Sequence, residues 1–225
     1  MAGKDEEIIT VDGPAGAGKS TVSKLLACRL GYLYLDTGAM YRAVAVLVHK
    51  EGIDPEDEGA LEVLCKGVHI SFAVIGGSQR IICQGEDLTG KIREPEMSWL
   101  ASTVSTQRPV REAMVNLQRE IGARGRIVAE GRDTGTVVFP RAKYKFFLLA
   151  DPKERAQRRY RELLAKGKQL KMEEGEEEMQ ERDQQDSSRD LAPLRPAADA
   201  RMIDSTHLTP EQVVEEMLKF IRNIK

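Results

Sequence analysis

Short apolar runs with the length of strands recur along the chain. They lie at residues 8–11, 32–36, 126–130, 145–151 and 200–206. Between several of these runs the apolar positions repeat with the period of a helix, as they do directly after the first strand. Strands that alternate with helices in this way predict an α/β fold, in which helices flank a mostly parallel sheet.

Two of the predicted helices have recognisable ends. The first has apolar side chains from Val22 to Leu30 on one face, and Gly31 follows where glycine commonly ends a helix. The last helix begins at Thr209, whose side chain can cap it. The side chain of Gln212 can reach back to the same residue, and together they predict a capping box.

Two segments interrupt the alternation. Residues 68–92 contain two β-rich runs on either side of a glycine pair at 76–77, a pattern typical of a β-hairpin. This pattern predicts a small antiparallel insertion in the α/β core. Residues 153–189 are highly charged, basic at first and then acidic over 173–178. An acidic run of this kind is usually a solvated surface.

Composition narrows the classes of protein that this chain can be. Its 225 residues suit one domain with small insertions. The net charge of −2 argues against a dedicated nucleic-acid binder, which usually has a basic excess. Three cysteines without a CxxC pair predict no disulfide framework. The acidic N-terminus is unlike a signal peptide, and no apolar run reaches the roughly 18 residues of a membrane helix. We therefore expect a cytoplasmic protein that binds neither nucleic acid nor membrane.

The segment GPAGAGKST directly follows the first strand and fits the P-loop pattern Gly-x4-Gly-Lys-Ser. Its glycines let successive backbone N–H groups turn towards phosphate oxygens. Lys19 would neutralise the β- and γ-phosphates, and Ser20 would offer a hydroxyl to Mg²⁺. A helix that begins here also directs its positive dipole end at the anion. The sequence predicts a nucleoside triphosphate site formed by Gly13, Pro14, Ala15, Gly16, Ala17, Gly18, Lys19, Ser20 and Thr21.

A P-loop alone does not distinguish a kinase from a switch or a motor. A GTPase would carry an NKxD motif, which this sequence lacks. A motor or regulatory ATPase would usually need a longer chain. The side chains that could bind a second anion therefore decide between these classes.

The motif LDTGAMYR ends the second strand and begins a helix predicted over 39–50. It places Asp36, Thr37 and Arg42 at the carboxyl end of a strand, where the sites of parallel sheets open. Thr37 could donate to a phosphate or a base, Arg42 could pair with a phosphate, and Asp36 could reach Mg²⁺ through water. The alternative is that Asp36 and Thr37 only cap the following helix.

The motif EGRDTGTVVFP supplies a second charged cluster after the strand at 126–130. Its glycines bracket Arg132 and Asp133, a pair that can hold a phosphate with one member and a base or sugar with the other. Glu130 ends the strand where P-loop enzymes keep an acid that orients Mg²⁺ or its waters. Upstream, the motif RPVREAM places Arg111 near the start of a helix, where an anion is also favoured.

Arginines gather again in residues 153–189, at spacings that place several of them on shared helix faces. Two helices with inward arginines suit a lid for phosphoryl transfer, because the transition state spreads charge over oxygens and water must be excluded. The side chains concerned are Arg155, Arg158, Arg159, Arg182, Asp186 and Arg189.

Four motifs, in their order and spacing, resemble the bacterial-type cytidylate kinases: GPAGAGKST, LDTGAMYR, GRDTGTVVFP and ERDQQDSSRDLAPLRPAADA. The resemblance spans essentially the whole chain. It implies transfer of the ATP γ-phosphate to CMP or dCMP with Mg²⁺, giving CDP or dCDP and ADP. It also implies a core over 1–66, 107–152 and 192–225, a nucleoside-monophosphate-binding insertion over 67–106 and a lid over 153–191. Balanced charge and a complete core lead us to expect a monomer.

Carried over residue by residue, the resemblance assigns each site side chain. Contacts to cytosine and sugar fall on Thr37, Arg111, Asp133 and Asp186. The arginines that grip the monophosphate are Arg42, Arg132, Arg182 and Arg189. The donor site falls on residues 13–21, with Arg158 near the adenine. The catalytic set is Lys19, Arg132, Arg182 and Arg189. In the family, other members have aspartate where this chain has Glu130. The Mg²⁺ contacts are expected from the residues themselves: Ser20 directly, and Asp36 and Glu130 through water.

Two alternatives remain open from the residues. A kinase for another small acceptor, such as UMP, AMP or shikimate, would share the P-loop and the lid arginines but lack the pair of Asp133 and Asp186. A non-catalytic nucleotide switch would bind a partner through the β-rich insertion and turn over slowly. The arginine clusters argue against the switch, because a switch has little use for a second anion pocket.

Overall fold

A computed structural model describes residues 7–165 and 172–223, and the chain in it divides into two compact units. The first unit consists of Met1–Leu35 with Gly122–Lys225, and the second of Asp36–Ile121. The insertion expected over 67–106 falls inside the second unit, which also contains the helices on either side of it.

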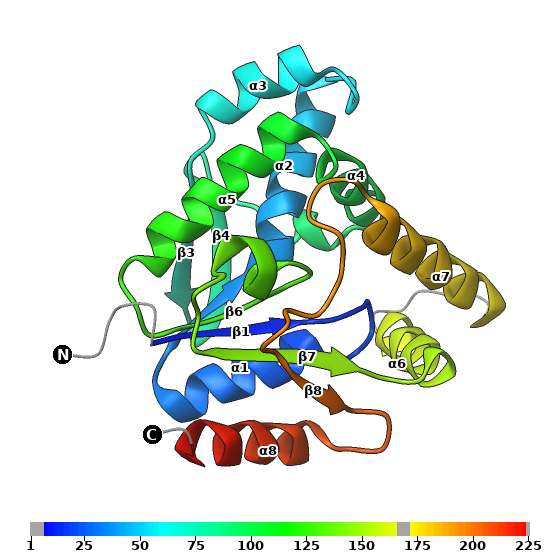
Figure 1. The fold of residues 1–225 in the computed structure, drawn as a ribbon. Coiled ribbons are helices and arrows are strands. Elements are labelled where there is room, and N and C mark those ends of the chain that lie inside the picture. Colours follow the sequence, from blue (N-terminus) through cyan, green and yellow to red (C-terminus); the bar gives the residue numbers. More distant parts are fainter. Residues whose placement is uncertain (1–6, 166–171, 224–225) are drawn as a thin grey trace. The chain divides into compact units, whose positions relative to one another are not determined.

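The first unit is built on a five-stranded sheet in the order β2-β6-β1-β7-β8 (Figure 1). The pairings β1–β6, β1–β7 and β7–β8 are parallel. The predicted α/β fold is therefore confirmed. The strands are β1 (Ile8–Asp12), β2 (Leu33–Asp36), β6 (Ile127–Gly131), β7 (Tyr144–Leu149) and β8 (Arg201–Asp204).

The helical elements of this unit are α1 (Lys19–Leu30), α6 (Pro152–Ala165), α7 (Met172–Ser188), α8 (Pro210–Asn223) and the π-helical turn η3 (Thr134–Val138). Helices α1 and α8 lie side by side on one face of the sheet (Figure 1). Gly31 ends α1 in a left-handed conformation, as predicted. The capping box at α8 is also confirmed, because the N–H of Thr209 donates to Gln212 Oε1 at 2.8 Å and the N–H of Gln212 to Thr209 Oγ1 at 3.3 Å.

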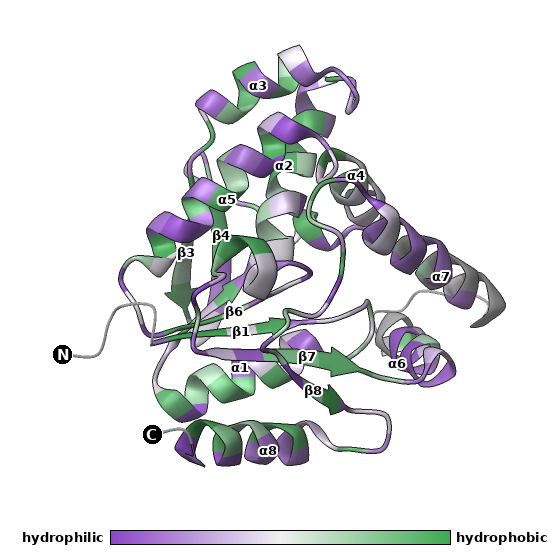
Figure 2. Ribbon diagram, viewed as in Figure 1, coloured by the Kyte–Doolittle hydropathy of each residue, from purple (hydrophilic) through white to green (hydrophobic). Residues whose placement is uncertain are grey.

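The apolar core of the first unit lies between the sheet and these two helices. Figure 2 shows the central strands β1 and β7 largely in the apolar colour and α6 mostly in the polar one. Phe146 on β7 is almost fully buried and packs edge to face on Phe220 of α8, with 5.7 Å between ring centroids. Burial of each such side chain contributes roughly 1.5–3 kcal/mol. This core holds rigid the strand ends from which the site is built.

The second unit joins helices to a small antiparallel sheet. It contains α2 (Thr37–Glu51), α3 (Glu58–Lys66), α4 (Pro95–Val104), α5 (Arg108–Gly122, which continues to the unit boundary), η2 (Lys91–Arg93), β3 (Ile70–Ile75), β4 (Ser78–Cys83) and β5 (Glu86–Asp87). Strands β3 and β4 pair antiparallel, and both glycines of their turn have positive φ, so the predicted hairpin is confirmed. Helices α2 and α4 pack together; α3 and α4 were not foreseen from the sequence.

Among the residues described, no helix is long and apolar enough to cross a membrane. The three cysteines Cys28, Cys65 and Cys83 are all free, in agreement with the prediction of no disulfide framework.

Candidate active site

The P-loop connects β1 to α1 at the carboxyl end of the sheet. Gly13 has φ of 147°, and a Cβ added to it would lie 2.2 Å from the carbonyl oxygen of Leu148 on β7. Gly16 and Gly18 have φ of 72° and 88°, in the left-handed region that favours glycine. The loop can therefore adopt this conformation only with glycine at these positions, and α1 begins at Lys19 directly behind it.

Lys19 is buried in this loop, and its Nζ donates to the carbonyl oxygen of Pro14 at 2.7 Å. Burial, together with the positive charge of Arg132, lowers the pKa of Lys19 to about 7, while the nearby carboxylates of Glu130 and Asp186 act in the opposite direction. An ammonium group so far from water favours an anionic partner. A bound phosphate would supply one.

Asp12 is a buried carboxylate that sequence reasoning missed. It ends β1 and accepts the N–H of Thr134 at 2.9 Å, the hydroxyl of Thr134 at 2.7 Å and the N–H of Gly135 at 2.7 Å. Burial raises its pKa, and these hydrogen bonds counteract the rise. Asp12 thus fixes the start of η3 against β1. Its only signal in the sequence is an acid at the end of a buried strand, immediately before the P-loop.

The segment between β6 and η3 contains Arg132 and Asp133, which contact Asp186 and Arg189 of the lid region. Arg132 Nε donates to Asp186 Oδ2 at 2.6 Å. Arg189 lies 3.7 Å from Asp133 Oδ1 through Nη2 and 3.8 Å from Asp186 Oδ1 through Nη1. The four side chains are at most 18% exposed. The structure therefore brings these four predicted site residues together in one cluster.

This cluster, Arg132–Asp133–Asp186–Arg189, alternates positive and negative groups. Burial alone would lower the pKa of Arg132, but the carboxylates of Asp186, Asp183 and Glu130 together outweigh it and raise the pKa above the ordinary value. Because two arginines and two carboxylates face each other away from water, the cluster can exchange an internal partner for a ligand group of the same charge. It can thus present arginines to a phosphate and carboxylates to hydroxyl or amine donors.

Glu130 lies at the end of β6, beside the cluster, and is 4% exposed. Its Oε1 accepts a short hydrogen bond from the hydroxyl of Tyr34 on β2. Sequence reasoning did not find Tyr34, because its partner is 96 residues away along the chain. The predicted acid is thus held in a fixed orientation near Lys19, whose charge it influences.

The lid arginines differ in their partners. Arg158 on α6 donates to the carbonyl oxygen of Ser205 at 2.6 Å and to that of Thr206 at 3.1 Å, so it is tied to the loop after β8. Arg155 donates to the carbonyl oxygen of Ala15 at 3.0 Å and pairs with Asp183 on α7. The side chains of Arg182 and of most residues in the acidic run at 173–178 are not among those that the structure describes.

Four predicted site residues belong to the second unit. Asp36 is the N-cap of α2 and accepts the N–H of Ala39 at 2.8 Å, so the capping role that the sequence left open is present. Arg42 lies 3.4 Å from Asp36 Oδ2. Thr37 is buried in the first turn of α2. Arg111 near the start of α5 is 5% exposed and donates to the carbonyl oxygen of Ser105 at 3.0 Å.

The fit to Mg²⁺ can be judged from the donors present. Within residues 7–165 and 172–223, no group of three or more His, Cys, Asp or Glu side chains could hold a metal by itself. Mg²⁺ bound with a nucleotide needs only one or two protein groups beside the phosphates. The exposed hydroxyl of Ser20 at the start of α1 and the buried carboxylate of Glu130 are donors of the kind it prefers.

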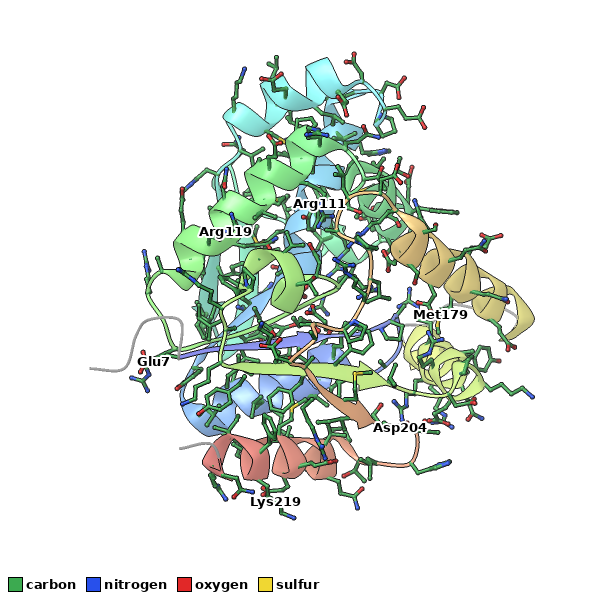
Figure 3. All side chains as sticks on the ribbon, in the orientation of Figure 1. Glu7, Arg111, Arg119, Met179, Asp204 and Lys219 are labelled. Atoms are coloured by element: carbon green, nitrogen blue, oxygen red, sulfur yellow. The ribbon has the colours of Figure 1, made fainter. Side chains whose placement is uncertain are left out.

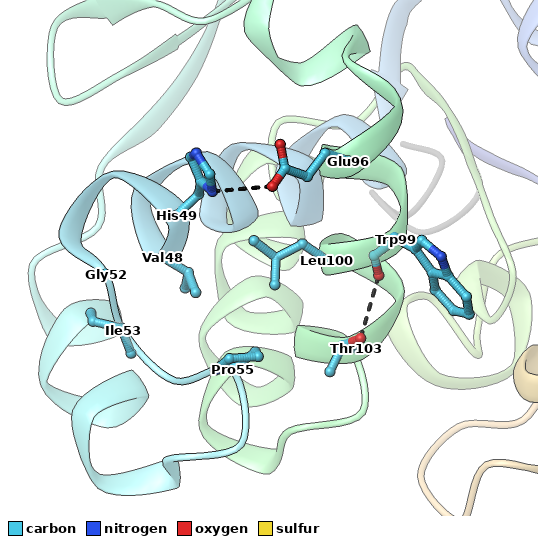
Figure 4. Close-up of a pocket in the computed structure, with 9 residues that line it drawn as sticks. All are labelled: Val48, His49, Gly52, Ile53, Pro55, Glu96, Trp99, Leu100 and Thr103. Atoms are coloured by element: carbon cyan, nitrogen blue, oxygen red, sulfur yellow. Dashed lines mark hydrogen bonds and ion pairs between the residues drawn. The ribbon is translucent and has the colours of Figure 1, made fainter.

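The second unit also has a pocket of about 470 Å³ (Figure 4). Apolar side chains such as Ile53 and Leu100 line it, with the exposed Trp99 at its edge. His49 Nδ1 lies 3.6 Å from Glu96 Oε1 beside them. None of the predicted site residues lines this pocket.

Comparisons with solved structures support the fold. An uncharacterized protein from Eubacterium ventriosum is 12% identical, with a TM-score of 0.52 and coverage of 96% of this chain and 98% of its own. A gluconokinase from Sinorhizobium meliloti is 16% identical, with a TM-score of 0.50 and coverage of 97% and 93%. At these identities the likeness extends to the fold alone.

Comparisons of sequence are far closer. A protein named cytidylate kinase from Citrifermentans bemidjiense is 51% identical over 93% of this chain and 90% of its own length. Another of that name from Geobacter sulfurreducens is 47% identical over 98% and 95%. The family described as cytidylate kinase matches residues 9–223. The resemblance seen in the four motifs is confirmed, and the chain belongs to the cytidylate kinase family.

Proposed function

We propose that this protein transfers the γ-phosphate of ATP to CMP or dCMP and so forms ADP with CDP or dCDP. The observation that carries the proposal is the combination of a complete P-loop with the buried cluster Arg132–Asp133–Asp186–Arg189. The P-loop accounts for a donor nucleotide, and the cluster provides charges of both signs for a second one. Membership of the cytidylate kinase family names that second nucleotide.

On the donor side, the backbone N–H groups of residues 13–21 other than Pro14 bind the phosphates, and Lys19 neutralises their charge. The low pKa of Lys19 supports this role. Burial removes the water that would stabilise its positive charge, and a phosphate would supply a negative charge in its place. Arg158 lies beside the adenine. Ser20 would hold Mg²⁺ directly, and Asp36 and Glu130 would hold it through water. When bound, it shields the charge of the phosphates.

On the acceptor side, the arginines grip the monophosphate and the carboxylates read the nucleoside. The monophosphate is bound by Arg42, Arg132, Arg182 and Arg189. Cytosine and sugar are bound by Thr37, Arg111, Asp133 and Asp186. The contacts of Arg132 with Asp186 and of Arg189 with Asp133 support this assignment, since each can be replaced by a ligand group of like charge.

No strong general base is needed, because the acceptor phosphate is already an anionic nucleophile. Catalysis then consists of positioning two polyanions in line and neutralising their repulsion. Lys19, Arg132, Arg182 and Arg189 supply that positive charge. Closure of the lid over both nucleotides would exclude water and limit wasteful hydrolysis of ATP.

The remaining parts of the proposal concern organisation. The core consists of residues 1–66, 107–152 and 192–225, the monophosphate-binding insertion of 67–106 and the lid of 153–191. The lid proposal is supported by α6 and α7, which pack together at the P-loop. We propose a monomer that acts in the cytoplasm.

Product analysis separates this kinase from a nucleotide switch. The protein is incubated with Mg²⁺ and ATP labelled on the γ-phosphate, with and without CMP, and the products are separated by chromatography. The label should appear in CDP when CMP is present, with little inorganic phosphate in either reaction. If CMP leaves the slow release of inorganic phosphate unchanged and no labelled CDP forms, the switch is the better account.

A further inference from the structure

A carboxylate of the lid occupies a hydrogen-bonding position of the P-loop. Asp183 Oδ1, on α7, accepts the backbone N–H of Ala15 at 3.2 Å. Backbone N–H groups of a P-loop are the groups that bind phosphate oxygens. A carboxylate oxygen and a phosphate oxygen are both anionic acceptors, so they would compete for this N–H group.

Arg155 holds that carboxylate in place from the other side. Its Nη1 makes a short ion pair with Asp183 Oδ2 and also donates to the carbonyl oxygen of Ala15 at 3.0 Å. Its Nε donates to the carbonyl oxygen of Ala150 at 3.1 Å. The side chains of Arg155 and Asp183 are only 10% and 20% exposed. A pair this far from water is screened less than a surface ion pair.

The lid helices also pack directly on the loop. A Cβ added to Gly16 would lie 3.0 Å from Arg155 Cβ and 3.2 Å from Met179 Cε. Met179 is 8% exposed and lies where α7 meets α6 (Figure 3). Glycine at position 16 thus allows α6 and α7 to approach the P-loop closely while Asp183 contacts Ala15.

We propose that Asp183 is an affinity-determining residue of the donor site, whose carboxylate competes with a phosphate of ATP for the N–H of Ala15. An entering triphosphate displaces the carboxylate, because two anions at one N–H group repel each other. Arg155, released from Asp183, then pairs with the phosphate. The same contact holds α7 on the P-loop. This inference rests on the donor half of the proposed function and does not depend on the identity of the acceptor.

Titration calorimetry with two ligands tests the inference. Inorganic tripolyphosphate and ATP are each titrated, without CMP, into the wild type, Asp183→Asn and Glu181→Gln. Glu181 is exposed on the same helix, so its variant removes the same charge without touching the P-loop. Asp183→Asn should bind both ligands about tenfold more tightly. The ligand would then no longer have to displace a charged hydrogen bond between Asp183 and Ala15, and the loss of one such bond corresponds to a change of this size. Glu181→Gln should stay within about twofold of the wild type.

Equal or weaker binding by Asp183→Asn would overturn the inference, since Asp183 would then be neutral or helpful to the donor. Asp183→Ser, a smaller uncharged variant, should show the same gain, and melting curves of all variants establish that they are folded. Production of labelled CDP by wild-type protein separates this result from failure of the proposed function. If the wild type bound neither ligand, both the inference and the donor site would be wrong.

Discussion

The surroundings of Lys19 change the pKa of its ammonium group, and this change has a measurable effect on stability. Its pKa is lowered from 10.5 to about 7 in the folded chain. Below pH 7 the side chain is protonated in both the folded and the unfolded states. The free-energy cost of burying its charge is therefore at its full value there. That penalty fades as the pH rises from 7 towards 10.5, because the folded state no longer has to hold the charge.

Lys19→Met should therefore raise the melting temperature of the unliganded protein by several degrees at pH 6, and by clearly less at pH 9. The same variant should lose most of kcat, since it cannot neutralise the phosphates. Thermal unfolding of both proteins across this pH range measures the first effect. A gain in melting temperature that does not vary with pH would contradict the cause given for the shift.

Arg132→Ala tests the acceptor role of the buried cluster. It removes the partner of Asp186, so we expect KM for CMP to rise tenfold or more, with a fall in kcat and little change in KM for ATP. Arg29→Ala is the matched control, because Arg29 lies on the surface of α1 and pairs only with Glu215 among the contacts described. Steady-state kinetics with CMP as the varied substrate gives the answer. If KM for CMP were unchanged in Arg132→Ala, the acceptor assignment would be wrong.

The residues of the site differ in how far the sequence reveals them. The P-loop was readable because its chemistry fixes residue types at fixed spacing. Arg132 and Asp186 were readable from the motifs around them. Asp12 and Asp183 were not, because each acts on backbone N–H groups that are distant in sequence, by 122 residues from Asp12 to Thr134 and by 168 from Asp183 to Ala15.

Among the elements, η3 depends most on a contact that the sequence does not reveal. Asp12→Asn should lower the free energy of unfolding by about 1–3 kcal/mol, because an amide nitrogen would face a backbone N–H that has lost its acceptor. Thr134→Val removes only the hydroxyl from the same group of bonds and should lower it by about 1 kcal/mol. Urea denaturation measures both values. Equal stability of Asp12→Asn and the wild type would show that these bonds do not anchor η3.

The regular elements follow local rules and were predicted accordingly. α8 begins at its capping box, and β3 and β4 form the hairpin that the glycine pair indicated. η3 breaks the helical period, and its start is fixed by Asp12 on β1 rather than by its own residues. α4 has buried Met97, Ala101 and Val104 at helical spacing. It is only ten residues long, so its apolar pattern is too short to predict a helix, and it packs against α2.

At the scale of the whole molecule, the free thiols report on the two units separately. Cys28 is exposed in the first unit, whereas Cys83 is 1% exposed in the second. Burial and the nearby Glu86 raise the pKa of Cys83 to about 11. At pH 8 a thiol reagent should therefore modify Cys28 rapidly and Cys83 only after denaturant is added. Peptide mapping after timed alkylation checks this. Rapid modification of Cys83 in native protein would mean that the second unit opens readily.

The division into units is the feature least visible in the chain. The hairpin drew attention to residues 67–106, but the compact second unit spans Asp36–Ile121. α2 and most of α5 belong to it, although their sequences look like ordinary helices of an α/β core. A unit boundary depends on which helices pack together, and helical periodicity records only that a helix has an apolar face.

A coupled assay of ADP release with a panel of acceptors tests the proposed function most directly. ATP and Mg²⁺ are supplied with CMP, dCMP, UMP, AMP or GMP in parallel. Release should depend on CMP and dCMP, with UMP much poorer and the purine nucleotides poorer still. If no monophosphate stimulated release, or if AMP or UMP matched CMP, the assignment of the acceptor to cytidine monophosphates would be contradicted.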